Sequence, residues 1–90
     1  MVFEWDENKN KTNIHKHGIP FDYAIQVFED ENRIEQYDEL HSDGEDRYDV
    51  IGMVDDILFV VCMFKADDVV RIISARKATK KKGGVMNGND

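Results

Sequence analysis

The chain has 90 residues, of which 41% are hydrophobic and 34% are charged, and its formal net charge is -7. This composition is typical of one globular domain and excludes an intrinsically disordered chain. The longest apolar run, Ile57 to Phe64, is too short for a membrane-spanning helix, which needs about 20 residues. The N-terminus has no recognisable secretory signal, and the single cysteine, Cys62, has no partner for an internal disulfide. We therefore expect a cytoplasmic protein with Cys62 buried in its core.

Two helices are predicted in the first third of the chain, after a short strand or extended segment at residues 2–5. Asp6 is suited to cap a first helix over residues 7–17, and Gly18 is suited to end it in a left-handed conformation. Pro20 favours the first turn of a second helix. Apolar side chains then recur with helical spacing and predict a helix that supplies much of the core: Phe21, Ala24, Ile25 and Phe28.

Three or four strands are predicted after the helices. The polar segment 33–40 is typical of an edge strand, and the Asp-Gly pair at 43–44 predicts a hairpin turn. The segment 47–53 alternates between polar and apolar residues, as a half-buried strand does. The run 57–64 is apolar on both faces, which favours a central position, and the segment 69–75 is the last expected strand.

A short basic helix is expected to begin near Arg76 or Lys77 and to end at the two glycines 83–84. The predicted order is therefore two N-terminal helices, an antiparallel sheet of three or four strands, and a basic C-terminal helix. Helices gathered on one face of an antiparallel sheet define an α+β fold. We expect one domain over residues 1–82 and a flexible tail over residues 83–90.

Positive charge is concentrated near the end of the chain. Residues 1–64 contain 16 Asp and Glu against five Lys and Arg, whereas residues 65–82 contain seven Lys and Arg against two Asp. A negative net charge normally argues against a polyanionic ligand. Because binding responds to the potential within about 8 Å at physiological salt, the local cluster still permits RNA as a ligand.

Metal binding and a catalytic carboxylate pair are both disfavoured. His15 and His17 lie two apart on the predicted helix and so point about 200° apart, while His41 lies in a distant loop. The acidic pairs 55–56 and 67–68 fall at predicted turns, which explains them without catalysis. His17 is explained by the helix dipole, which favours a cation at a helix C-terminus, although a proton-transfer or RNA-contact role stays open. No metal or other cofactor is expected.

Two arginine side chains, one directly after the last predicted strand and one in an earlier strand, suggest phosphate chemistry. Arg76 follows an apolar strand directly, where packing can hold its guanidinium in a fixed plane that suits phosphate, and Arg47 comes from a strand expected nearby. RNA cleavage needs no metal when the substrate's 2′-hydroxyl is the nucleophile. Regular alternation would place Arg71 and Arg76 on opposite faces of the sheet. For Lys81 and Lys82, a solvated charged surface stays the simpler interpretation.

The sequence resembles the BrnT family of toxins. The segment FEWDENKNKTNIHKHGIPF, residues 3–21, is similar to the family's opening pattern, and RIISARKAT, residues 71–79, resembles its later signature. The resemblance extends over roughly residues 3–80. It implies a RelE-like fold and a ribonuclease toxin of a type II toxin–antitoxin pair, acting without a cofactor. It also implies a BrnA-like antitoxin, a ribbon-helix-helix protein whose complex with the toxin binds operator DNA.

We predict roles in RNA cleavage for eight residues. The catalytic candidates are Arg47, Arg76, Lys80 and His17. The candidates for binding the RNA backbone are Lys16, Arg71, Lys77 and Lys81.

Two other functions stay open. Family members continue a helix where this chain has the glycine-containing residues 83–90, so a weak or inactive toxin-fold protein that binds the antitoxin and modulates repression is the main alternative. A free-standing nucleic-acid-binding protein is least favoured, because the sequence contains no reading helix and few exposed aromatic residues for base stacking.

Overall fold

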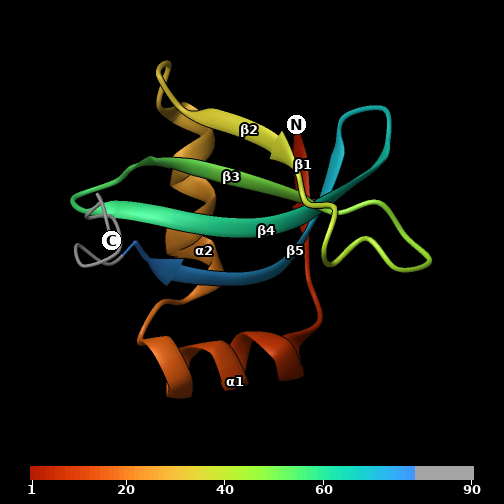
Figure 1. Ribbon diagram of the computed structural model, residues 1–90. Coiled ribbons are helices and arrows are strands. Elements are labelled where there is room, and N and C mark those ends of the chain that lie inside the picture. The colour runs from red at the N-terminus through yellow and green to blue at the C-terminus, as the bar shows by residue number, and fades with distance from the viewer. Residues whose placement is uncertain (79–90) are drawn as a thin grey trace.

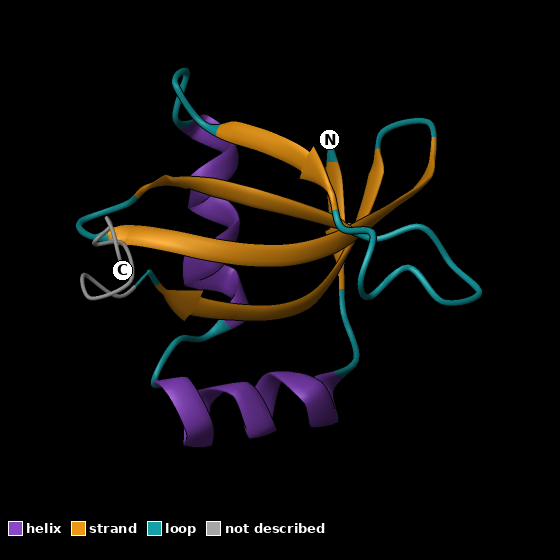
Figure 2. Ribbon diagram, in the orientation of Figure 1, coloured by secondary structure: helices purple, strands orange, loops and turns teal. Residues whose placement is uncertain are grey.

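The computed structural model describes residues 1–78, which form a five-stranded sheet with helices on one face and at one edge (Figures 1 and 2). The strand order is β1-β5-β4-β3-β2, and every neighbouring pair is antiparallel except β1 and β5, which run parallel. The strands are β1 (Val2–Glu4), β2 (Ile34–Tyr37), β3 (Tyr48–Met53), β4 (Ile57–Ala66) and β5 (Val69–Lys77). The helices are α1 (Glu7–His17), α2 (Phe21–Ala24) and the 3-10 helix η1 (Ile25–Glu29).

The α+β class and the central position of β4 are confirmed, but the sheet differs from the prediction in two ways. It has five strands, because β1 adds to the edge at β5, and this parallel pair makes the sheet mixed. Strand β5 also continues through Lys77, so the helix expected to begin at Arg76 or Lys77 does not begin there. The rest of that prediction and the expected tail 83–90 lie outside the described residues. No helix in residues 1–78 is long and apolar enough to cross a membrane.

Helix α1 begins and ends as its sequence predicts. The carboxylate of Asp6 accepts a hydrogen bond from the backbone N–H of Asn8 at 2.8 Å, which satisfies one of the free donors of the first turn. Gly18 adopts a φ of 71° and donates its N–H to the carbonyl of Ile14 at 2.8 Å. A side chain at Gly18 would be strained at this φ, so glycine is the favoured residue at this position.

The second helical segment begins after Pro20, as predicted, but it consists of a short α-helix followed by a 3-10 helix. In Figure 1 this segment lies behind the sheet. Strand β3 passes very close to it: a Cβ atom on Gly52 would lie 2.6 Å from a methyl group of Val27. Glycine at this position therefore lets the helical segment and the sheet approach each other.

The hydrophobic core lies between this helical segment and one face of the sheet. Residues from β3, β4 and β5 alternate into it, and Cys62 is among them, as expected. Figure 1 shows the sheet from its other face, which no helix covers, and we call this the open face. The buried core residues are Ile19, Phe21, Ala24, Val27, Val50, Leu58, Val60, Cys62, Val70, Ile72 and Ala75.

Helix α1 lies along β5 at the edge of the sheet, where its Asn13 side chain replaces a missing strand. Strand β1 pairs with β5 only as far as Arg71. Further along, the amide of Asn13 accepts from the N–H of Ala75 at 3.1 Å and donates to its carbonyl at 2.8 Å. It also donates to the carbonyl of Ile19 at 2.9 Å. The buried Asn13 thus satisfies backbone groups that water does not reach.

A β-bulge in β5 changes which side chains reach the open face. Ile72 pairs with Cys62, but Ser74 pairs with Val61, so Ile73 is an extra residue in β5. An extra residue reverses the alternation of side chains beyond it.

The bulge therefore corrects the predicted separation of Arg71 and Arg76. Arg71 pairs with Met63 and Arg76 pairs with Phe59, and both partners point to the same face of β4. Both arginines lie on the open face.

Candidate functional site

The open face contains a cavity of about 400 Å³ between the β2–β3 loop and strands β3, β4 and β5; we call it the main cavity. Its wall combines two arginines, two aspartates and a histidine with an apolar floor. The bulge at Ile73 places Arg76 on this face, and the fold of residues 38–47 brings Arg47 to the same place. The lining residues are Asp38, Leu40, His41, Arg47, Asp49, Phe59, Val61, Ile73, Ser74 and Arg76.

Arg76 is restrained by the aromatic ring beneath it. Its guanidinium carbon lies 4.4 Å from the centroid of the Phe59 ring, the residue with which it pairs across β4 and β5. A cation over an aromatic face gains about 0.5–1 kcal/mol at an exposed site and keeps the guanidinium plane oriented. Within residues 1–78, the donor groups at the edge of this plane have no hydrogen-bond or ion-pair partner.

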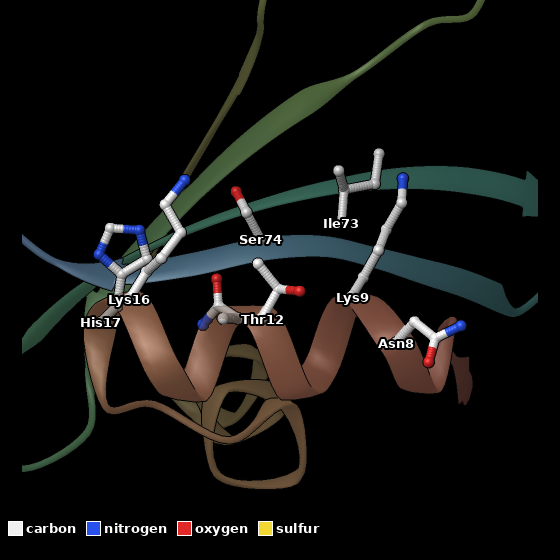
Figure 3. A pocket seen from close by; sticks show the side chains of 8 residues that line it. Asn8, Lys9, Thr12, Lys16, His17, Ile73 and Ser74 are labelled. Carbon is white, nitrogen blue, oxygen red and sulfur yellow. The ribbon is translucent and has the colours of Figure 1, made fainter.

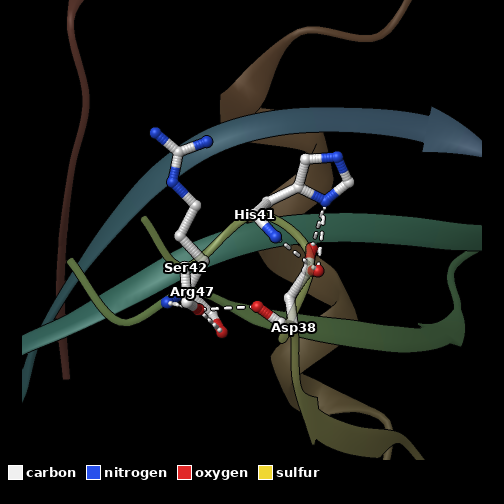
Figure 4. A network of polar contacts seen from close by, with 4 residues as sticks. All are labelled: Asp38, His41, Ser42 and Arg47. Carbon is white, nitrogen blue, oxygen red and sulfur yellow. Dashed lines mark hydrogen bonds and ion pairs between the residues drawn. The ribbon is translucent and has the colours of Figure 1, made fainter. Parts of the chain in front are cut away.

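Arg47 is positioned by the loop that precedes β3. The hydroxyl of Ser42 donates to the carbonyl of Asp38 at 2.6 Å and accepts from the N–H of Arg47 at 2.9 Å, as Figure 4 shows. One terminal nitrogen of the guanidinium pairs with the carboxylate of Glu45 at 3.1 Å. The Nε atom is buried and has no hydrogen-bond partner among the described residues.

Asp38 and His41 form the closest polar pair in the main cavity (Figure 4). The Nδ1 atom of His41 lies 3.1 and 3.0 Å from the two carboxylate oxygens of Asp38, and the backbone N–H of His41 donates to one of them at 3.2 Å. Burial alone raises the pKa of Asp38, but hydrogen bonds from His41 and Asp49 outweigh it and lower the pKa below its usual range. Asp38 therefore stays ionised and holds the imidazole.

Asp49 lies on β3 beside Asp38 and is only 7% exposed. Burial, followed by a hydrogen bond to the Asp38 carboxylate, raises the pKa of Asp49 to about 6. The two shifts have opposite directions because neighbouring carboxyls share one proton more easily than they both ionise. The Oδ1 atom of Asp49 is buried without a hydrogen-bond partner among the described residues.

A second cavity of about 310 Å³ lies between α1 and β5, and we call it the helix cavity. Figure 3 shows the side chains of Lys9 and Lys16 extending from α1 toward β5, with Ser74 between them. Both cavities include Ile73 and Ser74 in their walls, so they are neighbours on the open face. The lining residues of the helix cavity are Asn8, Lys9, Thr12, Asn13, Lys16, His17, Ile73 and Ser74.

The predicted site residues are thus distributed over several places. The main cavity includes Arg47 and Arg76, and the helix cavity includes His17 and Lys16. Two others lie outside both cavities and are paired with carboxylates: Arg71 with Glu4 at 3.0 Å, and Lys77 with Asp56 at 3.3 Å. The last two predicted residues, Lys80 and Lys81, lie outside the described residues.

Sequence reasoning missed three titratable residues of the main cavity: Asp38, His41 and Asp49. In the sequence, His41 stands out only as a potential metal ligand, and it lies in a loop distant from His15 and His17. The available signal was the spacing of Asp38 and His41, because an aspartate commonly binds a backbone N–H a few residues further along a turn. Within residues 1–78, no group of three or more His, Cys, Asp or Glu side chains is arranged to hold a metal ion.

Comparison with known proteins identifies the family. Residues 5–82 match the family described as ribonuclease toxin, BrnT, of type II toxin-antitoxin system. The structure is similar to the 1.1 Å crystal structure of the ribonuclease toxin BrnT from Brucella abortus, with 28% sequence identity and a TM-score of 0.66. This similarity covers 88% of the present chain and 99% of the Brucella chain. A search of curated proteins gives no significant match. The chain belongs to the BrnT family of ribonuclease toxins from type II toxin–antitoxin systems.

Proposed function

We propose that this toxin is a metal-independent endoribonuclease whose RNA substrate binds on the open face of the sheet. The observation that carries the proposal is the convergence of Arg47 and Arg76 on the main cavity. Two guanidinium groups at one cavity suit a phosphate and can stabilise the charge that develops on its oxygens during cleavage. The 2′-hydroxyl of the substrate supplies the nucleophile, so the reaction needs no metal ion.

The helix cavity supports a path for the flanking RNA backbone. Lys16 and His17 line it, and it adjoins the main cavity at Ser74. A nucleotide beside the scissile phosphate would place its own phosphate over α1, where lysine provides a cation. In this arrangement Arg71 contacts the RNA backbone elsewhere on the open face. Lys77, whose cross-strand partner Leu58 faces the core, contacts RNA that passes around the end of β5. The same role is proposed for Lys81, and an electrostatic role in catalysis for Lys80.

A type II toxin pairs with a protein antitoxin. We infer that the antitoxin is a BrnA-like ribbon-helix-helix protein and that the toxin reaches operator DNA only through the complex. The family assignment supports this partner. We further infer that the pair acts in the cytoplasm.

Cleavage of RNA by the purified protein in EDTA tests the proposal. We expect the wild type to cleave, and Arg76→Ala to lower kcat/KM about 100-fold, because it removes a cation from the developing phosphorane charge. Lys11→Ala is the matched control, since this exposed α1 residue lines neither cavity. A requirement for added Mg²⁺ would exclude the metal-independent mechanism. Unchanged cleavage by Arg76→Ala would remove Arg76 from it.

The alternative is a weak or inactive toxin that binds the antitoxin and modulates repression. It is favoured by the carboxylates beside the cations: Glu45 pairs with Arg47 at 3.1 Å, and Asp49 lines the cavity with Arg76. These negative charges oppose the binding of a polyanion. Expression without the antitoxin separates the two functions, because growth arrest supports the ribonuclease and normal growth with retained antitoxin binding supports the alternative.

A further inference from the structure

The Asp38–His41 pair has the geometry of a base held in one orientation. Carboxylate oxygens only accept hydrogen bonds, so the Nδ1 atom of His41, 3.0 Å from Asp38, carries the proton. The lone pair of the imidazole then resides on Nε2. Asp38 is nearly buried, whereas the side chain of His41 is 66% exposed, so the acceptor nitrogen is accessible to a ligand. A carboxylate that orients an imidazole in this way is a recurring arrangement for proton transfer.

The turn itself explains only part of this arrangement. The carboxylate of Asp38 accepts from the backbone N–H of His41, which is an ordinary way to stabilise a turn. That contact requires no particular side chain at position 41. It therefore does not explain an imidazole that lines the main cavity together with Arg47 and Arg76.

Two buried atoms in the wall of the same cavity indicate that a polar ligand belongs there. The Nε donor of Arg47 and the Oδ1 acceptor of Asp49 have no hydrogen-bond partner among the described residues. Buried polar atoms without partners are rare in folded proteins, because each costs roughly 1–3 kcal/mol. Once these two side chains turn toward a bound RNA, a phosphate offers an acceptor for the first atom and a ribose hydroxyl offers a donor for the second.

We propose that His41 is the general base of RNA cleavage and that Asp38 is its positioning residue. This inference rests on the ribonuclease function proposed above and assigns a residue that sequence reasoning left out. The charged groups around the imidazole in the cavity are Asp38, Asp49, Arg47 and Arg76.

Nε2 of His41 takes the proton of the 2′-hydroxyl, and the 2′-oxygen forms a bond to phosphorus. The bond between phosphorus and the 5′-oxygen breaks, and the 5′-oxygen takes a proton from water. The imidazolium returns its proton to the hydroxide that remains. The products are a 2′,3′-cyclic phosphate and a 5′-hydroxyl end.

The test compares His41→Gln with the control His15→Gln, an exposed histidine of α1 that lines neither cavity. We expect His41→Gln to cleave RNA in EDTA about 100-fold more slowly and to lose the acidic limb of the pH–rate profile, as removal of a general base predicts. Binding of a 2′-O-methyl RNA, which lacks the nucleophile, should change less than about twofold, in line with a residue that acts on the reaction and not on affinity. Asp38→Asn should lower the rate less, and it should likewise leave the binding of the 2′-O-methyl RNA within about twofold of the wild type.

Chemical rescue makes the test independent of a folding defect. Free imidazole added to His41→Ala should restore part of the lost rate, and it should not affect the wild type. If the wild type cleaves RNA and His41→Gln cleaves it equally fast, the role of His41 is overturned and the ribonuclease function stays intact. A wild type that cleaves no RNA at all would overturn both proposals.

Discussion

The two faces of the sheet use the same strands for opposite purposes. On β4, Leu58, Val60 and Cys62 are fully buried against the core, whereas Phe59 and Val61 form the floor of the main cavity. The apolar run 57–64 therefore supports a packed core on one side and a charged site on the other. One face supplies the free energy of folding, and the other presents the groups that we propose to contact RNA.

The open face also contains groups that oppose folding. Asp49 is buried there with a raised pKa, and the Nε atom of Arg47 has no partner among residues 1–78. Buried polar groups of this kind cost free energy unless a ligand satisfies them. The buried cluster between the helical segment and the sheet, in contrast, consists of apolar side chains and Cys62. Substitutions on the two faces should therefore change stability by different amounts and even in different directions.

The largest expected effect is on the core face. Leu58→Ala should lower the free energy of unfolding by about 3 kcal/mol or more, because it leaves a cavity among fully buried side chains. Urea denaturation measures this loss in the free energy of unfolding. The adjacent Ile57, which is half exposed, provides the control, and Ile57→Ala should cost under about 1 kcal/mol. Equal losses for the two variants would contradict the division between the faces.

The next effect concerns the edge where the two faces meet. Asn13→Ala should cost about 2–3 kcal/mol, because it leaves the N–H and carbonyl of Ala75 and the carbonyl of Ile19 without their partner. Urea denaturation gives the loss, and amide hydrogen exchange at Ala75 should accelerate. Lys11→Ala, on an exposed side of the same helix, should change neither quantity.

A substitution on the open face should raise stability, and only above a certain pH. The folded state holds the proton of Asp49 more tightly than the unfolded state, since its pKa is about 6 against an ordinary 3.8. This stabilising proton is fully present below about pH 3.8 and is lost as the pH rises through 6. Asp49→Asn should therefore stabilise the fold by on the order of 1 kcal/mol above pH 6.

Urea denaturation of the wild type and Asp49→Asn from pH 4 to pH 8 measures this difference. We expect the gain in the free energy of unfolding to grow between about pH 4 and pH 6 and then to level off. A difference that stays constant over this range would show that Asp49 does not retain its proton in the folded state.

The smallest effect is expected for the exposed ion pair between Lys77 and Asp56. Both side chains are 63% exposed and lie 3.3 Å apart, so Lys77→Ala should change the free energy of unfolding by under about 0.5 kcal/mol. The same variant should weaken RNA binding a few-fold at low salt and less at high salt, if Lys77 contacts the backbone. A titration at two salt concentrations measures this change, and a salt-independent loss would contradict the backbone contact.

Local signals in the sequence predicted much of the fold. The cap at Asp6, the left-handed Gly18 and the start of a helix after Pro20 all depend on residues within a few positions of each other. The strands were placed correctly within a few residues because apolar alternation and turn residues are also local. The expected start of a C-terminal helix at Arg76 or Lys77 was wrong because β5 continues through Lys77, where pairing with β4 outweighs the preference of the basic segment.

The candidate site was predictable only in part. Arg47 and Arg76 were selected for the chemistry of guanidinium, and both line the main cavity. The partners around them were missed. The spacing of Asp38 and His41 was a local signal for one contact, but the approach of Asp49 to Asp38 is recognisable only once the β2–β3 loop is folded.

The sequence by itself determined the limits of α1, the start of the second helical segment, the apolar central strand and the resemblance to a toxin family. These properties depend on neighbouring residues, whose spacing is visible in the chain. Only the tertiary structure decided that β1 joins β5 in parallel, that the bulge at Ile73 places Arg71 and Arg76 on one face, and that Asp38, His41 and Asp49 meet. The physical reason is register: a shift of one residue between paired strands moves every later side chain to the other face, and pairing over long distances sets that register.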